Sequence, residues 1–258
     1  MNATDYAQRL RDAYTNRTPI PPLREEIGID NITLAYEIQE INTEFRLENG
    51  ARPVGKKIGL TSFAVQKQLG VDQPDFGILF HDMEILTGQF ISMSELMQPK
   101  VEAEIAFVLA EDLDTDRLTS IDIINAIDYA LPAIEIVGSR VADWNIKITD
   151  TVADNASASH YVVGHTPKLL DAFDLINGKV VMTKNGEVAS EGSGHNCLGS
   201  PINATLWLAR KMYELGSPLT AGELIFTGAV GPMVSVQAGD HFHAKFEGLG
   251  DVSVSFTE

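Results

Sequence analysis

Apolar periodicity and capping residues predict helices in both halves of the chain. Apolar side chains recur three or four positions apart over residues 3–16 and 31–48, the spacing that gives a helix one apolar face. Bordering serine, threonine, proline or glycine residues favour further helices over residues 61–70, 121–130 and 200–215. Strands must therefore come from the segments between them.

Alternating or continuous apolar runs predict those strands. Residues 53–60 form a short β-like segment, and apolar and polar positions alternate over residues 100–109. Pro132 precedes a second apolar run, AIEIV, and the last forty residues carry apolar segments separated by Gly and Asp. The pattern is typical of a chain that mixes helices and strands.

Three segments rich in small or polar residues are interpreted as loops. Proline and glycine favour an ordered loop with little regular structure over residues 71–83. Residues 150–158 and 226–233 carry hydroxyl groups at Ser157 and Thr227. Such loops can admit a small ligand close to the backbone, or they can simply be turns.

The length of the chain is enough for one compact catalytic unit. A chain of 258 residues can bury a full hydrophobic core. It contains no repeat of 20 to 50 residues and no low-complexity linker that would divide it into independent halves.

Charge and cysteine content restrict the classes of partner. Nineteen Lys and Arg against 36 Asp and Glu give a net charge of −17, which repels phosphate backbones and anionic lipid headgroups. No apolar stretch approaches the roughly 18 residues of a membrane span. The single cysteine, Cys197, excludes an intramolecular disulfide. We therefore expect a cytoplasmic protein that binds neither nucleic acid nor membranes.

Three glutamates in apolar strands are the strongest chemical signal. Glu102 and Glu104 lie two residues apart, so one face of a strand would carry both carboxylates, and Glu135 could supply a third oxygen from a neighbouring strand. Carboxylates in a core need a cation, and oxygen ligands favour Mg²⁺ or Mn²⁺ over zinc. The alternative is an outward strand face in solvent, where glutamate is ordinary.

Lys57 and Asp75 are the second candidates. In the GKKIGL segment, one of two adjacent lysines must point away from solvent if the segment is a strand. A partly buried Lys57 could neutralise a substrate carboxylate or, with its pKa lowered by burial and a nearby metal, exchange protons near neutral pH. Asp75 could act as an acid or base beside it. The alternatives are two surface lysines and an aspartate that stabilises a turn.

Four segments resemble the 2-keto-4-pentenoate hydratases of the wider fumarylacetoacetate hydrolase superfamily. They are GKKIGLTSFAVQKQLGVDQPDFG, PKVEAEIAFVL, PAIEIVGSRVADWNIKITDTVADNAS and FTGAVGPM, and the likeness extends from about PLREEIGIDN to the C-terminus. The resemblance implies an α+β fold, the mixed β-roll of that superfamily with a smaller N-terminal α/β region. We place the N-terminal region at residues 1–75 and the catalytic domain at 76–258, the two acting as one unit.

The resemblance also implies roles for individual residues. The E-x-E pair and a later glutamate of the family bind a divalent cation, which by position implies Glu102, Glu104 and Glu135 here, with Mg²⁺ or Mn²⁺ as the ion. The K-x-G-L lysine matches Lys57 and the P-D-F-G acid matches Asp75. We expect Ser157 and Thr227, from the two small-residue loops, to contact the substrate.

The implied reaction is hydration of 2-hydroxypenta-2,4-dienoate to 4-hydroxy-2-oxopentanoate in aromatic meta-cleavage catabolism, by a homo-oligomer that takes a small 2-oxo or 2-hydroxy acid. The alternatives are decarboxylation of 4-oxalocrotonate, hydrolysis of a carbon–carbon bond in an acylpyruvate, and a non-catalytic carboxylate-binding partner of a pathway decarboxylase. We also expect that this protein, acting as the hydratase, forms a complex with a decarboxylase of the same pathway. The segment GVDQPDFG is more similar to the hydratases.

Overall fold

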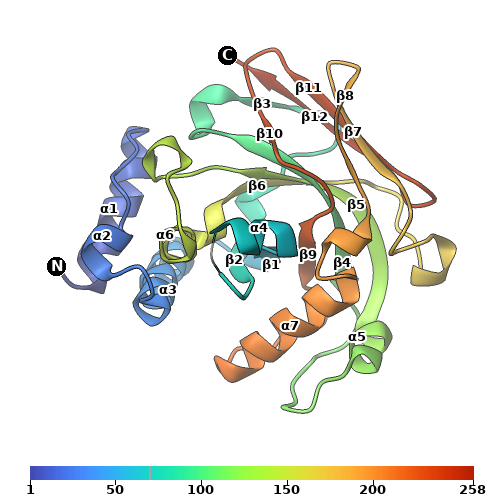
Figure 1. Cartoon of the computed structure of the whole chain (residues 1–258), viewed down its shortest axis with the longest axis horizontal. Coiled ribbons are helices and arrows are strands. Elements are labelled where there is room, and N and C mark those ends of the chain that lie inside the picture. The colour runs from blue at the N-terminus through green and yellow to red at the C-terminus, as the bar shows by residue number, and fades with distance from the viewer. Residues whose placement is uncertain (70) are drawn as a thin grey trace.

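The computed structural model describes residues 1–69 and 71–258 and shows mixed sheets flanked by helices (Figure 1). The α-helices are α1 (Ala3–Asn16), α2 (Arg24–Ile27), α3 (Ile32–Glu48), α4 (Phe63–Leu69), α5 (Ser120–Ala126), α6 (Ile148–Ala153) and α7 (Pro201–Glu214). The strands are β1 (Pro53–Gly59), β2 (Asp75–Phe80), β3 (Phe90–Ser92), β4 (Lys100–Leu109), β5 (Ile127–Val137), β6 (Ala158–Val163), β7 (Val180–Lys184), β8 (Glu187–Gly192), β9 (Leu224–Ala229), β10 (Val234–Ser235), β11 (His241–Phe246) and β12 (Gly250–Thr257).

The strands form two sheets. One has the order β2-β1-β9-β4-β5-β6, with β10 pairing with β4, and the other has the order β3-β12-β11-β7-β8. Only the β1–β9 and β12–β3 pairs among these strands are parallel, so both sheets are mixed. The main hydrophobic core contains side chains from both sheets and from α7. The large sheet is therefore covered on the face where β11 and β12 pack near β5.

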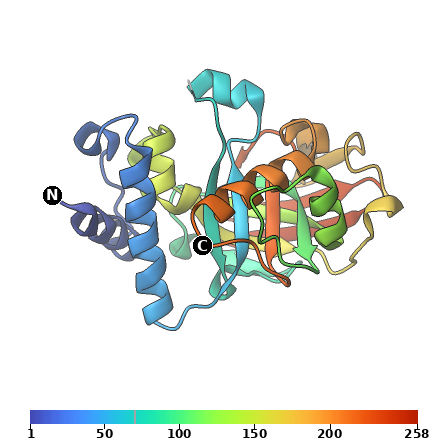
Figure 2. The same ribbon diagram turned by 90° about the horizontal axis from the view of Figure 1, so that it is seen from below.

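The N-terminal helices form a second, smaller core. Apolar side chains of α1, α2 and α3 pack with those of α6, a helix more than a hundred residues later in the chain. Figure 2 shows this group at one end of the molecule, with β1 and β2 between it and the rest of the large sheet. Because α6 contacts both α3 and β2, the helical group is anchored to the edge of that sheet.

Most of the predicted elements are confirmed. The helices over 3–16, 31–48 and 200–215 correspond to α1, α3 and α7, and the predicted strands over 53–60 and 100–109 to β1 and β4. The helix over 61–70 is observed as α4, and Gly70 itself lies outside the described residues.

The prediction of a loop over residues 71–83 is wrong, because strand β2 and the 3₁₀ turn that follows it occupy residues 75–83. Proline and glycine favour turns, but Pro74 lies just before the strand and Gly77 within it. A Cβ atom at Gly77 would lie 2.3 Å from the carbonyl oxygen of Asn155. This glycine therefore permits a close backbone approach rather than a turn.

Two other boundaries are corrected. The helix predicted over 121–130 ends at Ala126, and β5 runs through Pro132 instead of starting after it. Pro132 lies at the end of the β5–β6 ladder, where its carbonyl oxygen accepts from Gly164 N–H at 2.8 Å, so the ladder does not need the N–H that proline lacks. The loop predicted over 150–158 instead contains most of α6 and a single 3₁₀ turn. The loop predicted over 226–233 is likewise wrong in its first half, because strand β9 extends to Ala229.

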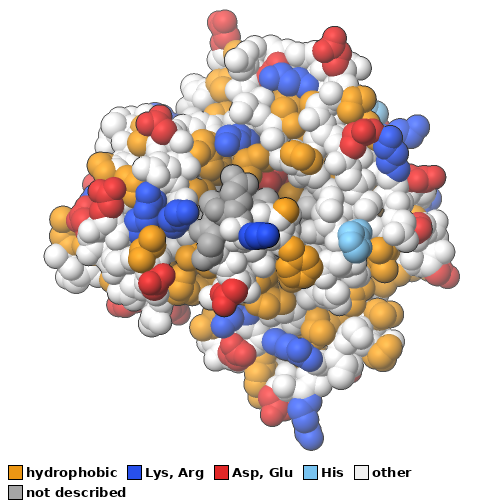
Figure 3. Space-filling view, viewed as in Figure 1, with side chains coloured by type: hydrophobic (Ala, Val, Ile, Leu, Met, Phe, Trp, Pro, Cys, Tyr) orange, Lys and Arg blue, Asp and Glu red, His pale blue; other side chains and the backbone are white. Residues whose placement is uncertain are grey.

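Charged side chains are dispersed over the visible face of the molecule. In Figure 3, Lys and Arg side chains alternate with acidic and apolar ones instead of forming one basic patch on that face. None of the helices within the described ranges has the length and apolar character required to span a membrane.

Candidate active site

The three glutamates predicted to converge lie together at the centre of the large sheet. Antiparallel pairing of β4 with β5 places Glu102 directly opposite Glu135, and Glu104 is two residues further along the same face of β4. Each of the three offers a carboxylate oxygen, and these oxygens lie within 4.8 Å of one another. The sheet register thus assembles the cluster from two strands.

This cluster is buried and poor in hydrogen bonds. The side chains of Glu104 and Glu135 are about 1% and 0% exposed, and Glu102 is half-buried. Glu104 Oε2 accepts from the backbone N–H of Gly228 at 2.8 Å. The other oxygen of Glu104 and both oxygens of Glu135 have no hydrogen-bond partner of ordinary geometry among the described residues. Three acidic groups are thus held close together with few donors to stabilise their charge.

The acidity of the cluster reflects that burial. Burial, together with the charge of Glu135, raises the pKa of Glu102 to about 7. Burial also raises the pKa of Glu104 well above its usual range, and the neighbouring glutamates raise it further. The pKa of Glu135 is raised by burial, although Lys57 opposes that effect.

Lys57 supplies the nearest positive charge from β1. Its Nζ lies 3.3 Å from Glu135 Oε1 and donates to the carbonyl oxygen of Ala156 at 2.8 Å. Burial lowers the pKa of Lys57, but the carboxylates of Glu135 and Asp75 outweigh it, so the net pKa is raised. Burial alone therefore gives no net lowering of this pKa, and the expected lowering, which also invoked a nearby metal, stays a prediction.

Both lysines of the GKKIGL segment are buried, on opposite faces of β1. Lys56 forms an ion pair with Glu223, with 2.7 Å between Nζ and Oε1, away from the glutamate cluster. Lys57 faces the cluster. The interpretation of two surface lysines is excluded, and the alternation of the strand explains why only one of them reaches the site.

Asp75 faces Lys57 from the start of β2. Residue Gly59 of β1 lies opposite Asp75, and a Cβ atom at Gly59 would be 2.2 Å from Asp75 Oδ1 and 3.3 Å from Lys57 Nζ. Burial raises the pKa of Asp75, while the charge of Lys57 opposes the rise. The two side chains therefore meet over a glycine that leaves room for both.

Ser157 lies in a strained turn beside these groups. Asn155, Ala156 and Ser157 have consecutive positive φ angles of 53°, 49° and 59°, a conformation that is costly for residues other than glycine. The Asn155 side chain holds the turn against β2 by accepting from Ile78 N–H at 2.8 Å and donating to its carbonyl oxygen at 3.0 Å. The turn directs the Ala156 carbonyl oxygen at Lys57.

Thr227 lies apart from the open part of the site. It is fully buried in β9, and its hydroxyl donates to the carbonyl oxygen of Ile105 at 2.7 Å. It is not among the described residues that line the adjoining cavity, whereas Ser157 is. Six of the seven predicted residues thus either line this cavity or belong to the glutamate cluster beside it. The seventh, Thr227, instead holds β9 against β4 through its hydrogen bond to Ile105.

A cavity of about 490 Å³ opens over this site. Its charged lining residues are Lys57, Asp75 and Glu102. The remainder is largely apolar and includes Leu60, Val137, Trp144, Ile146 and Met233. Sequence reasoning gave no role to Trp144, or to the backbone groups of Ala156 and Gly228. A backbone group has no sequence signal, because every residue carries a carbonyl oxygen.

The residues present fit a divalent cation. All the converging ligand atoms are carboxylate oxygens, and one oxygen of Glu104 and both of Glu135 are buried without a hydrogen-bond partner of ordinary geometry within the described ranges. Hard cations such as Mg²⁺ and Mn²⁺ prefer oxygen ligands of this kind. The cluster of acids, costly by itself, becomes favourable once a doubly charged ion compensates it.

Comparisons with known proteins agree with the geometry. Residues 60–257 match the family model described as fumarylacetoacetate (FAA) hydrolase C-terminal. The chain is 52% identical over 252 residues to the TodF product hydratase of Pseudomonas putida F1, covering 98% of this chain and 94% of that protein. It is 53% identical over 250 residues to a 2-keto-4-pentenoate hydratase of Paraburkholderia xenovorans, covering 97% and 93%.

A solved structure shows the same fold at a lower identity. The 4-oxalocrotonate decarboxylase of Pseudomonas putida G7, complexed with magnesium and adipate, superposes with a TM-score of 0.95 at 33% identity, covering 98% of this chain and 97% of that one. With the matched family model and these relatives, the chain belongs to the fumarylacetoacetate hydrolase family and, within it, to the group of the 2-keto-4-pentenoate hydratases.

Proposed function

We propose that the protein hydrates 2-hydroxypenta-2,4-dienoate, the enol form of 2-keto-4-pentenoate, to 4-hydroxy-2-oxopentanoate. The observation that carries the proposal is the group of three glutamates beside Lys57, next to a cavity whose lining is largely apolar. Relatives at about half identity over nearly the whole chain bear the name of this activity. The reaction is one of the meta-cleavage degradation of aromatic compounds.

Glu102, Glu104 and Glu135 would hold the divalent cation, which we take to be Mg²⁺ or Mn²⁺. When bound, such an ion attracts the adjacent carboxylate and 2-oxo oxygens of the substrate and stabilises negative charge on the 2-oxo oxygen. Glu104 is further fixed by the N–H of Gly228, which holds one of its oxygens while leaving the other for the ion. The protein thereby orients the ligands before the ion arrives.

Lys57 and Asp75 are the proposed proton-handling groups, because both line the cavity next to the cluster. Hydration requires a proton at C5, which gives the 2-oxo-3-enoate, then water at C4 and a proton at C3. The Ala156 carbonyl oxygen and Glu135 fix the ammonium of Lys57 at the wall of the cavity. Ser157 would contact the bound substrate, and Thr227, an expected contact, would act there only through its neighbours.

The side chains that line the cavity favour hydration of the dienoate over decarboxylation of 4-oxalocrotonate. That substrate carries a second carboxylate at the end remote from the 2-oxo group. Lys57 is the only Lys or Arg among the described residues that line this cavity, and the walls beyond it include Leu60, Ile146 and Met233. A distal carboxylate would be desolvated there without a counter-ion, whereas the CH₂ terminus of the dienoate would not.

A direct assay tests the proposal. Purified protein with Mg²⁺ or Mn²⁺ is supplied with the dienoate and with 4-oxalocrotonate, while loss of ultraviolet absorbance and release of CO₂ are followed. We expect loss of the dienoate and formation of 4-hydroxy-2-oxopentanoate. CO₂ from 4-oxalocrotonate with an inert dienoate would assign the decarboxylase activity instead, and inertness toward both would favour a non-catalytic partner.

We further propose a more detailed fold, an oligomeric state and a partner for the protein. The two mixed sheets would form the β-roll of the fumarylacetoacetate hydrolase type, with residues 1–75 and 76–258 acting as one unit, which the pairing of β1 with β2 across that boundary supports. A cytoplasmic homo-oligomer is proposed, as is a complex with a pathway decarboxylase. Exposed Phe63 and Phe90 are apolar side chains that such contacts would cover.

A further inference from the structure

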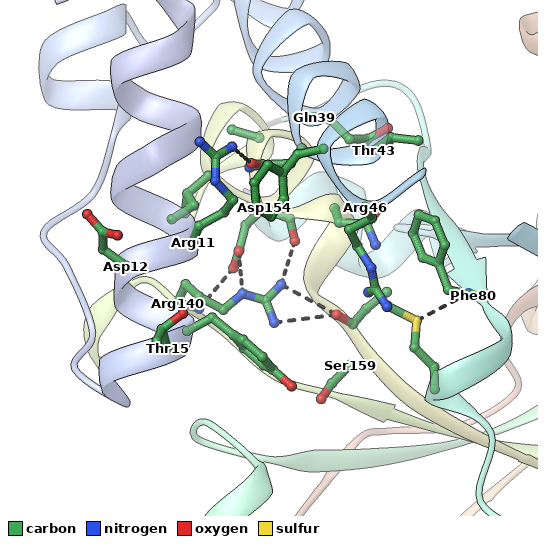
Figure 4. Close-up of a pocket in the computed structure, with 18 of the residues that line it drawn as sticks. Arg11, Asp12, Thr15, Gln39, Thr43, Arg46, Phe80, Arg140, Asp154 and Ser159 are labelled. Atoms are coloured by element: carbon green, nitrogen blue, oxygen red, sulfur yellow. Dashed lines mark hydrogen bonds and ion pairs between the residues drawn. The ribbon is translucent and has the colours of Figure 1, made fainter. Parts of the chain in front are cut away.

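A second cavity, of about 450 Å³, lies between the N-terminal helices and the large sheet (Figure 4). Its walls come from α1, α3, the end of β2 and residues 153–155 and 158–160, together with Arg140. It shares no lining residue with the cavity over the glutamate cluster. Asn155 and Ala158 line this second cavity, whereas Ala156 and Ser157, which lie between them in the sequence, line the first.

Three arginines line this second cavity from different elements. Arg46 of α3 forms an ion pair with Asp82, and Arg140 forms a buried ion pair with Asp154. Arg11 of α1 has no carboxylate partner among the described residues. Its Nη1 donates to Asn42 Oδ1 and its Nη2 to Gln8 Oε1, each at 2.6 Å.

One nitrogen of Arg11 has no hydrogen-bond acceptor among the described residues. This nitrogen is the buried Nε. The remaining acid of the cavity wall, Asp12, accepts from Gln8 Nε2 at 2.7 Å. Arg46 and Arg140 are paired directly with acids, whereas Arg11 reaches Asp12 only through the Gln8 side chain, so its guanidinium keeps an open hydrogen-bond site at Nε. An anion would satisfy both the charge and the donor.

The rest of the wall favours a flat apolar body attached to that anion. The guanidinium of Arg11 lies 4.4 Å from the centre of the Phe45 ring, and that of Arg46 lies 4.0 Å from the centre of the Phe80 ring. Leu10 is a further apolar lining residue. Aromatic rings and aliphatic side chains of this kind accommodate a planar, apolar group, while a phosphate would leave them in contact with a strongly hydrated ion.

We propose that this cavity is a second binding site for a small aromatic or dienoic monocarboxylate, whose carboxylate binds Arg11 and whose body lies against Phe45 and Phe80. The site is separate from the glutamate cluster and needs no metal.

A ligand in this cavity would contact the turn that orients Lys57. The backbone N–H of Arg140 donates to Asp154 Oδ2 at 2.9 Å, and its Nη2 donates to the Asp154 carbonyl oxygen at 2.7 Å. Asp154 directly precedes the strained residues Asn155 to Ser157, and Asn155 itself lines the cavity. Binding would therefore favour one arrangement of the turn and change the hydration rate, a consequence that rests on the proposed function.

Calorimetric titration with benzoate, in buffer with EDTA, tests the binding site. We expect benzoate to bind the wild type and benzamide, its neutral counterpart, not to bind. Arg11→Gln should weaken benzoate binding by about tenfold or more, because it removes the charged hydrogen-bond donor. The matched control, Arg117→Gln, changes an exposed arginine remote from the cavity and should bind benzoate as the wild type does.

Several outcomes would overturn the proposal. They are equal binding of benzamide, unchanged benzoate binding in Arg11→Gln, and benzoate binding that requires Mg²⁺, which would place it at the glutamate cluster. If Arg11→Gln does not fold, Phe45→Ala on the exposed side of α3 tests the same cavity, and unchanged binding there would contradict it.

The effect on the reaction has a separate readout. A change in kcat or KM with benzoate that Arg11→Gln abolishes supports the link to Lys57, and bound benzoate without any change in rate contradicts that link. Because calorimetry does not depend on turnover, failure of the binding site and failure of the hydratase assignment are distinguishable.

Discussion

At the scale of the residue, the environment of Lys57 differs from that of its neighbour Lys56 although both are buried. Lys57→Met removes the ammonium that faces Glu135 and the cavity, and we expect the hydration rate to fall about 10²- to 10⁴-fold, as for loss of a positioned acid–base group. Lys56→Met is the matched control, because its ion pair with Glu223 faces away from the cluster. It should lower stability but keep the rate per folded molecule, as measured by kcat alongside urea unfolding.

The pair of variants separates a chemical role from a structural one. Equal loss of rate in Lys57→Met and Lys56→Met would indicate that both act through the stability of β1. A wild-type rate in folded Lys57→Met would remove this lysine from the mechanism.

His160 makes the fold sensitive to acid. Burial lowers its pKa from 6.5 to about 4; Glu95 and Asp82 oppose the shift, and Arg17 and Arg46 add to it. Between these pH values the unfolded chain binds a proton that the folded chain does not. The free energy of unfolding therefore falls as the pH drops from 6.5 toward 4, by at most about 3 kcal/mol from this group.

Urea unfolding at pH 7 and at pH 4.5 measures this contribution. We expect His160→Gln to lose less stability than the wild type between the two pH values, since it has no imidazole to protonate. The carboxylates of the glutamate cluster are present in both proteins, so the difference between them isolates His160. An identical decrease in the two proteins would contradict the prediction.

At the scale of the element, the close approach of β1 and β2 depends on Gly59. Gly59→Ala places a Cβ atom against Asp75 Oδ1 and near Lys57 Nζ, so one of these side chains must move or the strands must separate. We expect a loss of stability of about 1–3 kcal/mol, typical of overpacking, together with a lower kcat.

Gly50→Ala provides the comparison. Gly50 has a φ of 88°, so alanine is strained there, but its Cβ atom would meet nothing within 4 Å. Thermal unfolding and kcat are measured for both variants. Gly50→Ala should lose stability without a change in rate, and a normal rate in Gly59→Ala would show that the Asp75–Lys57 arrangement tolerates displacement.

At the scale of the whole molecule, the glutamate cluster couples metal binding to stability. Without metal, Glu104→Gln removes one of three crowded buried carboxylates and should raise the melting temperature. With saturating Mg²⁺ or Mn²⁺ the order should reverse, because the wild type gains about 2.7 kcal/mol at a hundredfold excess over Kd and the variant binds the ion more weakly.

Differential scanning calorimetry with and without a chelator follows this reversal. Glu111→Gln, which changes an exposed glutamate, should behave as the wild type in both conditions. A wild-type protein whose melting temperature is the same with metal and with chelator would exclude a bound ion at the cluster.

The sequence predicted those elements whose apolar pattern is strong and local. The periodic helices α1, α3 and α7 and the alternating strand β4 follow from spacing alone, and so does the placement of Glu102 and Glu104 on one face. Strand β2 was missed because Pro74 and Gly77 are turn residues in most local contexts, and their purpose here depends on a partner strand and on Asn155.

The candidate site also combines features that local sequence predicts with features that depend on distant segments. The seven residues were chosen from local motifs and from the family resemblance, and their functional roles stay predictions. The positive φ angles of residues 155–157 and the carbonyl oxygen that meets Lys57 could not be predicted, because they arise from contacts between distant segments. The burial of the Thr227 hydroxyl against Ile105 likewise follows from the pairing of β9 with β4.

The order of residues sets the kinds of side chain available to the chemistry and the strand faces on which they lie, because alternation along an extended chain is a local property. It does not set that Glu135 lies opposite Glu102 or that Lys57, and not Lys56, faces the glutamates; these depend on how the strands pair. The cavity beside Arg11 likewise forms only when the N-terminal helices pack on the sheet. Register and packing depend on which segments become neighbours, and that choice is made by the free energy of the whole fold rather than by any one stretch of residues.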